Sequence, residues 1–405
     1  MDNITLAKED IKYIWHPCTQ MKIHEEFPII PIKSGYGVYL EDFDGNKYID
    51  AISSWWVNLF GHNNSYINGK VKEQLETLEH TIFAGFSHLQ AINLAKRVTK
   101  LTNMDKVFFA DNGSSSVEIA IKLAFHYYKN SGEIRPYILS LQNSYHGETI
   151  GALSVSDLGL YRDIYEPILI KNIVSPIDID KFEEILKTNH HKINSFIFEP
   201  FVQCAGGMQM YSEEFLYSAK ELCKKYNILM IADEIAVGFG RTGKMFATDF
   251  ADIMLLSKGL TGGYMPLALV LMKNYIYDSF YCEYGKGRDF LHSHSYTANP
   301  IACSAANAVL DIFENDNIIE KNRDLIEYIS TKLSNIQSNK IKNIRQKGMI
   351  CAMDIENLNS FEFRKKASDM GVILRPLGNV VYIMPPYVTS KSEIDTIFEV
   401  IETLC

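Results

Sequence analysis

Short runs of apolar residues alternate with helical stretches over the middle of the chain. These runs contain almost no polar side chains, whereas a strand with one face in water would alternate apolar and polar positions. Strands buried on both faces and separated by helices are typical of α/β proteins with a mainly parallel sheet. The predicted strands are Val107–Ala110, Tyr137–Leu141, Phe196–Phe198, Ile228–Ile231, Ile253–Leu256 and Ala268–Met272.

Two of the intervening helices have clear sequence signals. Ser212, followed by Glu213 and Glu214, predicts an N-cap with an acidic first turn. The other helix follows Asn112-Gly113, and its apolar positions recur at helical spacing at Val117, Ala120, Ile121, Ala124 and Tyr128.

The pattern changes toward both ends of the chain. Residues 29–49 read as short strands joined by turns, and from residue 299 a long helical region leads into the apolar run MICAMDI (349–355), a helix near 360–369 and two further strands. We therefore expect a large α/β domain over residues 61–298. A smaller α/β domain would combine residues 1–60 with residues 299–405.

Composition narrows the class of protein. The chain has 405 residues and a net charge of −9, which argues against a nucleic-acid-coating surface. No segment approaches the roughly 18 apolar residues of a membrane span, and the N-terminal segment has no secretory apolar core, so a cytoplasmic protein is expected. The seven cysteines form no CxxC pair, and the histidine pairs lack other residues at ligand spacing, so no metal site is expected.

The polar residues that follow the predicted strands indicate a ligand site. Ligands of open parallel sheets bind beyond the carboxyl ends of the strands. Here five strands are followed by Asn112-Gly113-Ser114, Tyr145-His146-Gly147, Glu199-Pro200, Asp233-Glu234 and Ser257-Lys258-Gly259.

Each of these groups has an ordinary structural explanation when taken alone. A Gly-Ser run can simply cap a helix, and Asp233 can lie at the surface. Together they match pyridoxal phosphate: the helix start around Gly113 and Ser114 for the phosphate, Tyr145 against the ring, and Asp233 for the pyridine nitrogen. Lys258 at the edge of the core would lose its proton readily and form the Schiff base.

At this point the sequence resembles a known family. DEIAVGFGRTGKMFA (233–247) followed by SKGLTGGYMPLA (257–268) resembles the class III, or ω-type, aminotransferases of fold type I, over almost the whole chain. The resemblance implies a fold type I large domain with a mostly parallel seven-stranded sheet flanked by helices. It implies the same roles for Lys258, Asp233, Gly113, Ser114 and Tyr145. It also implies a homodimer in which Ser295, within HSHSYTANP (292–300), reaches the phosphate of the other subunit.

Three further motifs narrow the resemblance. WHPCTQM (15–21), SSWW (53–56) and LRPLGNVVYIMPPY (374–387) are similar to those of the members that aminate 8-amino-7-oxononanoate in biotin biosynthesis. By that resemblance Trp55 and Trp56 line the slot for the alkyl chain and Arg375 pairs with the distal carboxylate. Because neighbouring side chains of a strand point to opposite faces, at least one of the two tryptophans is also expected to pack in the core.

Departures from the family pattern bear on the substrates. Ala205 and Ala236 stand where ornithine- and 4-aminobutyrate-type relatives carry polar residues, which argues against a glutamate-type second substrate. The resemblance implies S-adenosylmethionine, the usual donor of this subgroup, as the amino donor. Cys18 stands where the subgroup commonly has a pocket tyrosine, which keeps lysine as the alternative donor. Glu148 replaces an aspartate, and its role is open.

Other functions compete with this interpretation. One is a different class III aminotransferase acting on diamines or β-amino acids. A nucleotide-dependent oxidoreductase would need G-x-G-x-x-G, which N-G-S-S-S-V lacks. A regulator that senses pyridoxal phosphate would need a basic DNA-reading module, and the sequence shows none.

Overall fold

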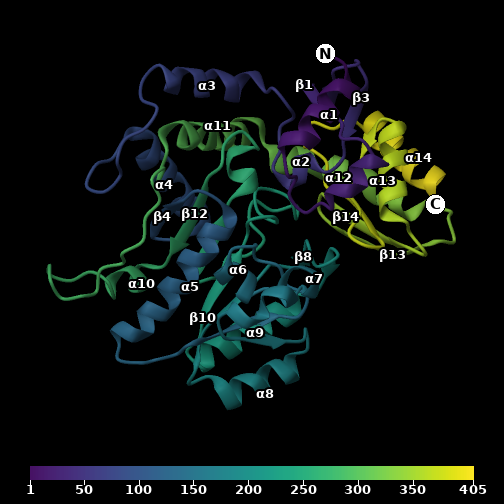
Figure 1. The fold of residues 1–405 in the computed structure, drawn as a ribbon. Coiled ribbons are helices and arrows are strands. Elements are labelled where there is room, and N and C mark those ends of the chain that lie inside the picture. Colours follow the sequence, from purple (N-terminus) through teal and green to yellow (C-terminus); the bar gives the residue numbers. More distant parts are fainter. The chain divides into compact units, whose positions relative to one another are not determined.

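The computed structural model describes residues 1–405 and divides into two compact units. Tyr66–Lys321 form one of them, here called the central unit. Met1–Ser65 and Asn322–Cys405 together form the other, the terminal unit. Figure 1 shows that purple N-terminal and yellow C-terminal elements share the terminal unit.

A seven-stranded sheet forms the middle of the central unit. Its strands are parallel, with one exception: β12 runs antiparallel to both of its neighbours. This confirms the predicted α/β architecture with a mostly parallel sheet. In spatial order the strands are β4 (Lys106–Ala110), β12 (Ala268–Met272), β11 (Ile253–Leu256), β10 (Leu229–Asp233), β7 (Ile193–Phe198), β5 (Tyr137–Leu141) and β6 (Asn172–Ser175).

Six of these strands coincide with the predicted apolar runs, differing from them only at their ends. The seventh, β6, was not predicted, because only Ile173 and Val174 are apolar in its four residues. Its position at the edge of the sheet, beside β5 alone, explains why polar residues are tolerated there. A small hairpin, β8 (Val202–Gln203) with β9 (Gln209–Met210), follows β7.

Helices connect the strands of the central unit. They are α3 (Ser65–Leu75), α4 (Leu89–Thr102), α5 (Gly113–Asn130), α6 (Ile150–Ser154), α7 (Gly159–Arg162), η2 (Asp163–Ile168), α8 (Ile179–Asn189), α9 (Glu213–Lys225), η3 (Lys258–Thr261), α10 (Asn274–Asp278) and α11 (Pro300–Asp316). The predicted cap of α9 is confirmed, since Ser212 Oγ accepts a hydrogen bond from the Phe215 N–H at 3.2 Å.

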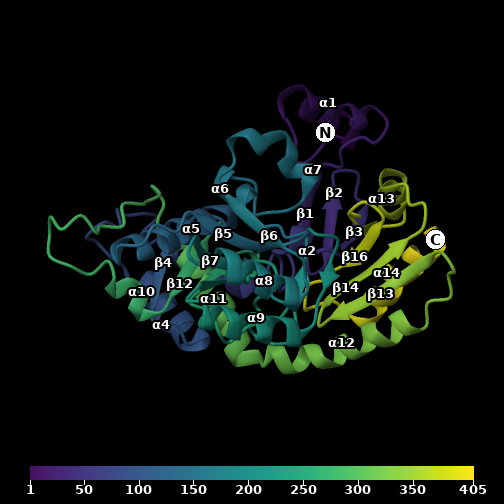
Figure 2. The same cartoon turned by 90° about the horizontal axis from the view of Figure 1, so that it is seen from below.

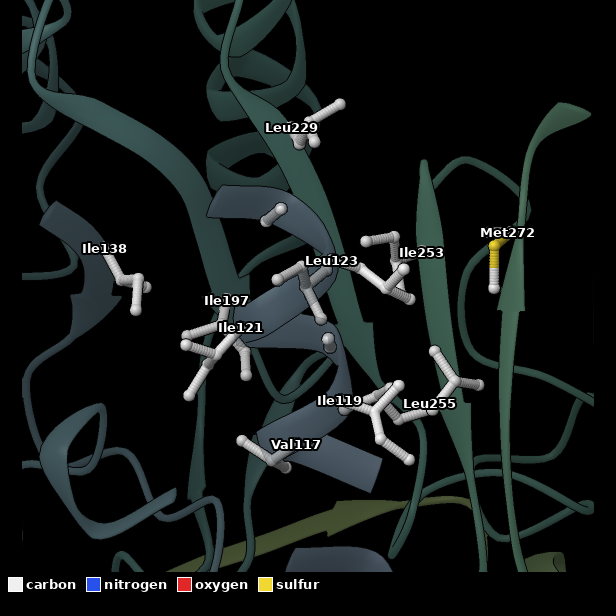
Figure 3. Close-up of a cluster of buried hydrophobic side chains, with 14 of the residues drawn as sticks. Val117, Ile119, Ile121, Leu123, Ile138, Ile197, Leu229, Ile253, Leu255 and Met272 are labelled. Carbon is white, nitrogen blue, oxygen red and sulfur yellow. The ribbon is translucent and has the colours of Figure 1, made fainter. Parts of the chain in front are cut away.

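Helix α5 lies across one face of the sheet and fills the main core. Figure 3 shows its apolar side chains directed at residues of the strands, including Ile197, Ile253 and Leu255. Each fully buried aliphatic side chain of this kind stabilises the fold by about 1.5–3 kcal/mol. The helical spacing read from the sequence is confirmed, because all its predicted core positions are buried: Val117, Ala120, Ile121, Ala124 and Tyr128.

The terminal unit contains two smaller sheets. One has the order β1 (Ile32–Tyr36), β2 (Tyr39–Asp42), β3 (Lys47–Asp50), β15 (Val372–Ile373), and the other has the order β13 (Ile341–Lys347), β14 (Ile350–Ile355), β16 (Val380–Ile383). Figure 2 shows the second sheet in the yellow-green of the C-terminal segment. The helices are α1 (Asn3–Tyr13), η1 (Met21–Glu25), α2 (Ser53–Trp56), α12 (Ile318–Ser334), α13 (Ser360–Asp369) and α14 (Lys391–Leu404).

Strand β15 joins the two ends of the sequence. It pairs in parallel with β3, so that Val372 lies opposite Ile49 and Ile373 opposite Asp50. A unit built from both chain ends follows from this pairing. Its second boundary falls at residues 321/322, whereas the sequence suggested 298/299. The reason is α11, which packs against α4 and η3 and therefore belongs to the central unit.

Candidate active site

The five segments that follow β4, β5, β7, β10 and β11 carry the candidate residues of the central unit. All five strands run in the same direction, so these segments lie along one edge of the sheet. Each begins where a buried strand ends, which places polar side chains at the border of the core.

The segment after β4 starts helix α5. Asn112 caps the helix, with its Oδ1 accepting from the Ser115 N–H at 3.0 Å, and the first-turn N–H groups of Gly113 and Ser114 have no helical acceptor. A Cβ on Gly113 would lie 3.1 Å from Ile235 Cδ1, so only glycine lets the helix start approach that side chain without displacing it. Such a helix start is an anion-binding site.

Asp233 ends β10 and is 4% exposed. Its Oδ2 lies 2.7 Å from His146 Nδ1, and its Oδ1 accepts from the Ile235 N–H at 3.2 Å. His146 itself is buried, and its Nε2 has no hydrogen-bond partner. No role was predicted for His146 from the sequence, although it stands between Tyr145 and Gly147 in one of the five segments.

Lys258 follows β11 and opens η3. Its backbone is left-handed, with φ of 47°, and its side chain is partly buried. Burial lowers the pKa of the Lys258 amine, against the opposing attraction of nearby Cys204, Asp233 and Glu199. A neutral amine is a nucleophile, so Lys258 has the environment that covalent amine chemistry requires.

Glu199 directly follows β7 and also belongs to this group of residues. It is 5% exposed, and its carboxylate accepts from the N–H groups of Tyr145 and Cys204, both at 3.0 Å. Burial raises the pKa of Glu199 to about 7. The sequence signal for this residue was a carboxylate placed directly after a strand of six buried residues.

Tyr145 and Glu148 connect these segments. The Tyr145 hydroxyl donates to Glu148 Oε1 at 2.9 Å, and the Glu148 N–H donates to Ser114 Oγ at 3.3 Å. The Tyr145 ring also packs edge-on against Tyr161. Glu148, whose role the sequence left open, thus links the candidate ring-stacking tyrosine to the start of α5.

Ser295 belongs to a segment of the central unit that follows α10. It is exposed and forms no hydrogen bond with Lys258, Asp233, Gly113 or Ser114. Its segment runs beside the start of α5, where His294 Nδ1 lies 3.6 Å from Asp111 Oδ2. The resemblance assigned Ser295 to the site of the other subunit, and this assignment stays a prediction.

The remaining candidates lie in the terminal unit, which brings three of the four together. Arg375 Nη2 donates to the carbonyl oxygen of Cys18 at 3.3 Å, and its guanidinium lies 4.8 Å from the centre of the Trp55 ring. Trp55 is 39% exposed, whereas Trp56 is 3% exposed and packs edge-on against Tyr382. Trp56 is therefore a core residue of this unit, and Trp55 is the exposed member of the pair.

Trp55 and Trp56 belong to a segment with an unusual backbone conformation. Ser53, Ser54, Trp55 and Trp56 all have positive φ, from 47° to 74°, which costs about 1–2 kcal/mol for each non-glycine residue. The buried carboxylate of Asp50 holds this left-handed turn by accepting from Ser54 N and Oγ, at 2.9 and 2.7 Å. Ser53 Oγ donates to the Met384 carbonyl at 2.7 Å and anchors its other side.

The residues of the central unit fit pyridoxal phosphate. The start of α5, whose first-turn N–H groups have no helical acceptor, suits its phosphate; the buried Asp233 suits a protonated pyridine nitrogen; and Lys258 is an amine of lowered pKa. With the seven-stranded sheet, this group defines a pyridoxal-phosphate-dependent enzyme of fold type I.

Comparison with known proteins establishes the family. The model of the family described as "Aminotransferase class-III" matches residues 20–404. The chain therefore belongs to the class III aminotransferases, which depend on pyridoxal phosphate. The adenosylmethionine-8-amino-7-oxononanoate aminotransferase of Helicobacter pylori is 48% identical, covering 96% of this chain and 95% of that protein. The Geobacter sulfurreducens protein of the same name is 37% identical, covering 99% and 97%.

Solved structures agree with this family. The crystal structure of adenosylmethionine-8-amino-7-oxononanoate aminotransferase from Methanocaldococcus jannaschii superimposes with a TM-score of 0.96 at 34% identity, covering 99% of each chain. An omega transaminase from Pseudomonas jessenii in complex with PMP gives a TM-score of 0.92 at 26% identity, covering 98% of this chain and 97% of that one. No helix of this chain is long and apolar enough to cross a membrane.

Proposed function

We propose that this aminotransferase converts 8-amino-7-oxononanoate to 7,8-diaminononanoate in biotin biosynthesis, with S-adenosylmethionine as the amino donor. The names of relatives that match almost the whole chain support this substrate pair. For amino transfer itself, the observation that carries the proposal is Lys258, an amine of lowered pKa beside the buried Asp233.

The residues of the central unit would divide the work as follows. Pyridoxal phosphate, when bound, supplies a carbonyl that receives the amino group and a ring that takes up an electron pair. The N–H groups of Gly113 and Ser114 hold the phosphate, and Asp233, oriented by His146, keeps the ring nitrogen protonated. Lys258 holds the cofactor covalently at rest and afterwards moves the proton of the substrate carbon.

Tyr145 would pack against the ring. Its backbone is held by Glu199 and its hydroxyl by Glu148, so the ring orientation is set from two sides. In the terminal unit, Trp55 would contact the alkyl chain of the acceptor and Arg375 its carboxylate. The same arginine and tryptophan would meet both substrates, since the two bind in turn.

The donor depends on the surroundings of Cys18. This residue is exposed, has a φ of 48°, and contributes its carbonyl oxygen to Arg375. A cysteine offers less stacking area than the tyrosine of other members, which keeps lysine as the alternative donor. A second candidate function, transfer between diamines or β-amino acids, uses the same central-unit chemistry with another acceptor.

The enzyme would act in the cytoplasm as a homodimer, with Ser295 of each subunit reaching the phosphate of the other. The exposure of Ser295 supports this arrangement. Sedimentation of the purified protein measures the assembly directly, and a monomer that is fully active would contradict it.

The first experiment follows the absorbance of the bound cofactor. S-Adenosylmethionine and lysine are added in separate cuvettes, with 7,8-diaminononanoate as a control for the reverse direction. Conversion to the pyridoxamine form by S-adenosylmethionine and by the control is the expected result. Conversion by lysine instead changes the donor and keeps the pathway. If neither donor nor the control changes the spectrum, the proposed substrates are wrong.

A further inference from the structure

The terminal unit has a pocket of about 450 Å³ that extends beyond Trp55 and Arg375. This volume is within the range of sites for small organic molecules. One side is closed by Phe27 and Phe361, whose rings stack at 6.5 Å with 10° between their planes. Much of the remaining wall is aliphatic, from Ile23, Ile29, Ile30, Ile32 and Ile373.

Two arginines line this apolar pocket without ion-pair partners. Arg375 bonds only a carbonyl oxygen and packs over Trp55, and the guanidinium of Arg364, on α13, forms no hydrogen bond or ion pair. Two other basic groups in the wall have acidic partners: Lys365 Nζ lies 2.7 Å from Asp369 Oδ2, and His16 Nε2 lies 2.6 Å from Asp10 Oδ1. His24 also lines the pocket, and its buried Nε2 has no hydrogen-bond partner.

The two guanidinium groups are close enough to oppose each other. Arg364 as a whole residue is exposed, but partial desolvation of its guanidinium in the pocket wall, and then the charge of Arg375, lower its pKa. Two like charges without ion-pair partners beside an apolar wall favour the binding of an anion, and a carboxylate can accept from two guanidinium groups at once. The wall requires that this anion carry an apolar chain.

We propose that Arg364 is a second substrate-binding arginine, which holds the acceptor's distal carboxylate together with Arg375 while the apolar wall contacts its methylene chain. This inference rests on the proposed function, since 8-amino-7-oxononanoate joins a carboxylate to such a chain. Arg364 lies on α13, which precedes the motif that contains Arg375 (374–387). None of the motifs that carry the family resemblance includes Arg364.

Ligand binding tests this directly. The holoenzyme is titrated calorimetrically with nonanoate and with nonanamide, its uncharged counterpart. Arg364→Gln is expected to weaken nonanoate binding about ten- to hundredfold and to leave nonanamide binding unchanged, because a charge-assisted contact is lost. Arg364→Lys should restore part of the affinity, since it returns the charge without the planar fork.

A matched control lies on the same helix. Lys366 pairs with Glu362 at 2.7 Å and does not line the pocket, so Lys366→Gln should leave both affinities unchanged. Thermal unfolding of each variant separates a local effect from a loss of fold. Equal nonanoate affinity in the wild type and in folded Arg364→Gln would overturn the inference.

Kinetics separate this inference from the proposed function. With 8-amino-7-oxononanoate, Arg364→Gln should raise KM by the same factor as nonanoate Kd and keep most of kcat. If the wild type does not turn over this acceptor but its nonanoate affinity depends on Arg364, the substrate assignment fails and the carboxylate pocket stands. If it turns over the acceptor with a KM unaffected by Arg364→Gln, the pocket fails and the assignment stands.

Discussion

His146 Nδ1 lies 2.7 Å from Asp233 Oδ2, and both side chains are buried, although 87 positions separate them in the sequence. The imidazole of His146 fixes the orientation of the Asp233 carboxylate. The backbone of His146 is fixed in turn, because its N–H donates to Ser156 Oγ at 2.9 Å. Asp233, which we propose faces the pyridine nitrogen, is therefore held in place by a residue that follows β5, two strands away from β10 in the sheet.

Removing this partner should affect both stability and activity. His146→Ala leaves a buried carboxylate without its partner, so we expect the free energy of unfolding to fall by about 3–5 kcal/mol. Urea titration measures the loss, and kcat should fall with it. His190→Ala is the control, since His190 is partly buried and bonds only a backbone carbonyl. Equal effects of the two substitutions would contradict the role given to His146.

Lys258→Ala should abolish amino transfer without weakening the fold. We expect kcat to fall by at least about a thousandfold, because the nucleophile and proton carrier are both lost. Stability should stay equal or rise, because burial disfavours the ammonium form. Borohydride reduction followed by mass spectrometry should attach the cofactor to the wild type and to Lys273→Ala, and not to Lys258→Ala. Attachment at another lysine would refute the assignment.

Glu199 should make stability depend on pH. Its pKa rises from 4.5 to about 7 on folding, so between these values the folded state binds more protons than the unfolded state. Stability then falls as pH increases through this range. Glu199→Gln removes this pH dependence. The free energy of unfolding of the variant, relative to that of the wild type, should therefore rise between about pH 5 and about pH 8. Urea titrations at both values measure the change, and parallel profiles would exclude it.

Gly147 packs against Ser114 at the start of α5, and we expect no larger residue to be tolerated there. Its φ is +127°, and a Cβ there would lie 2.1 Å from Ser114 Oγ and 3.1 Å from Ser114 Cα. Gly147→Ala should lower the melting temperature and weaken cofactor retention, measured by dialysis and absorbance. Gly69→Ala is the counterpart: a Cβ there meets nothing within 4 Å, and helix α3 should gain up to about 1 kcal/mol.

The two tryptophans should separate substrate binding from stability. Trp56→Ala empties a core site and should lower the free energy of unfolding by about 3–5 kcal/mol. Trp55→Ala should raise KM for the acceptor and change stability much less, because this ring is 39% exposed. Steady-state kinetics beside urea titration distinguish the two. A similar stability loss in both variants would contradict the division.

The sequence predicted what depends on local pattern. Continuous apolar runs gave the strands, and residues directly after them, such as Asp233 and Lys258, were candidates because they begin where the core ends. It could not predict the partnership of His146 with Asp233, which arises only when β5 and β10 take their places in the sheet. It also could not predict the left-handed turn of SSWW (53–56). This segment contains no glycine that would indicate a positive φ, and the turn is stabilised by hydrogen bonds to Asp50, which lies outside the motif.

Polar strands were missed for a similar reason. β13, IKNIRQK, has one buried residue, and its place in a sheet depends on pairing with the buried strand β14. The second boundary between the units differs from the predicted domain limit because α11 resembles the helix that follows it in sequence. Its contacts with the central unit appear only in three dimensions.

The pairing of β3 with β15 also sets the order in which the newly made chain can fold on the ribosome. Residues up to Ser65 emerge first, yet their sheet lacks its fourth strand until Val372 and Ile373 have been synthesised. The central unit, Tyr66–Lys321, is complete before then and can fold as it leaves the exit tunnel. The N-terminal segment therefore completes its sheet only late in translation, after the central unit has left the exit tunnel.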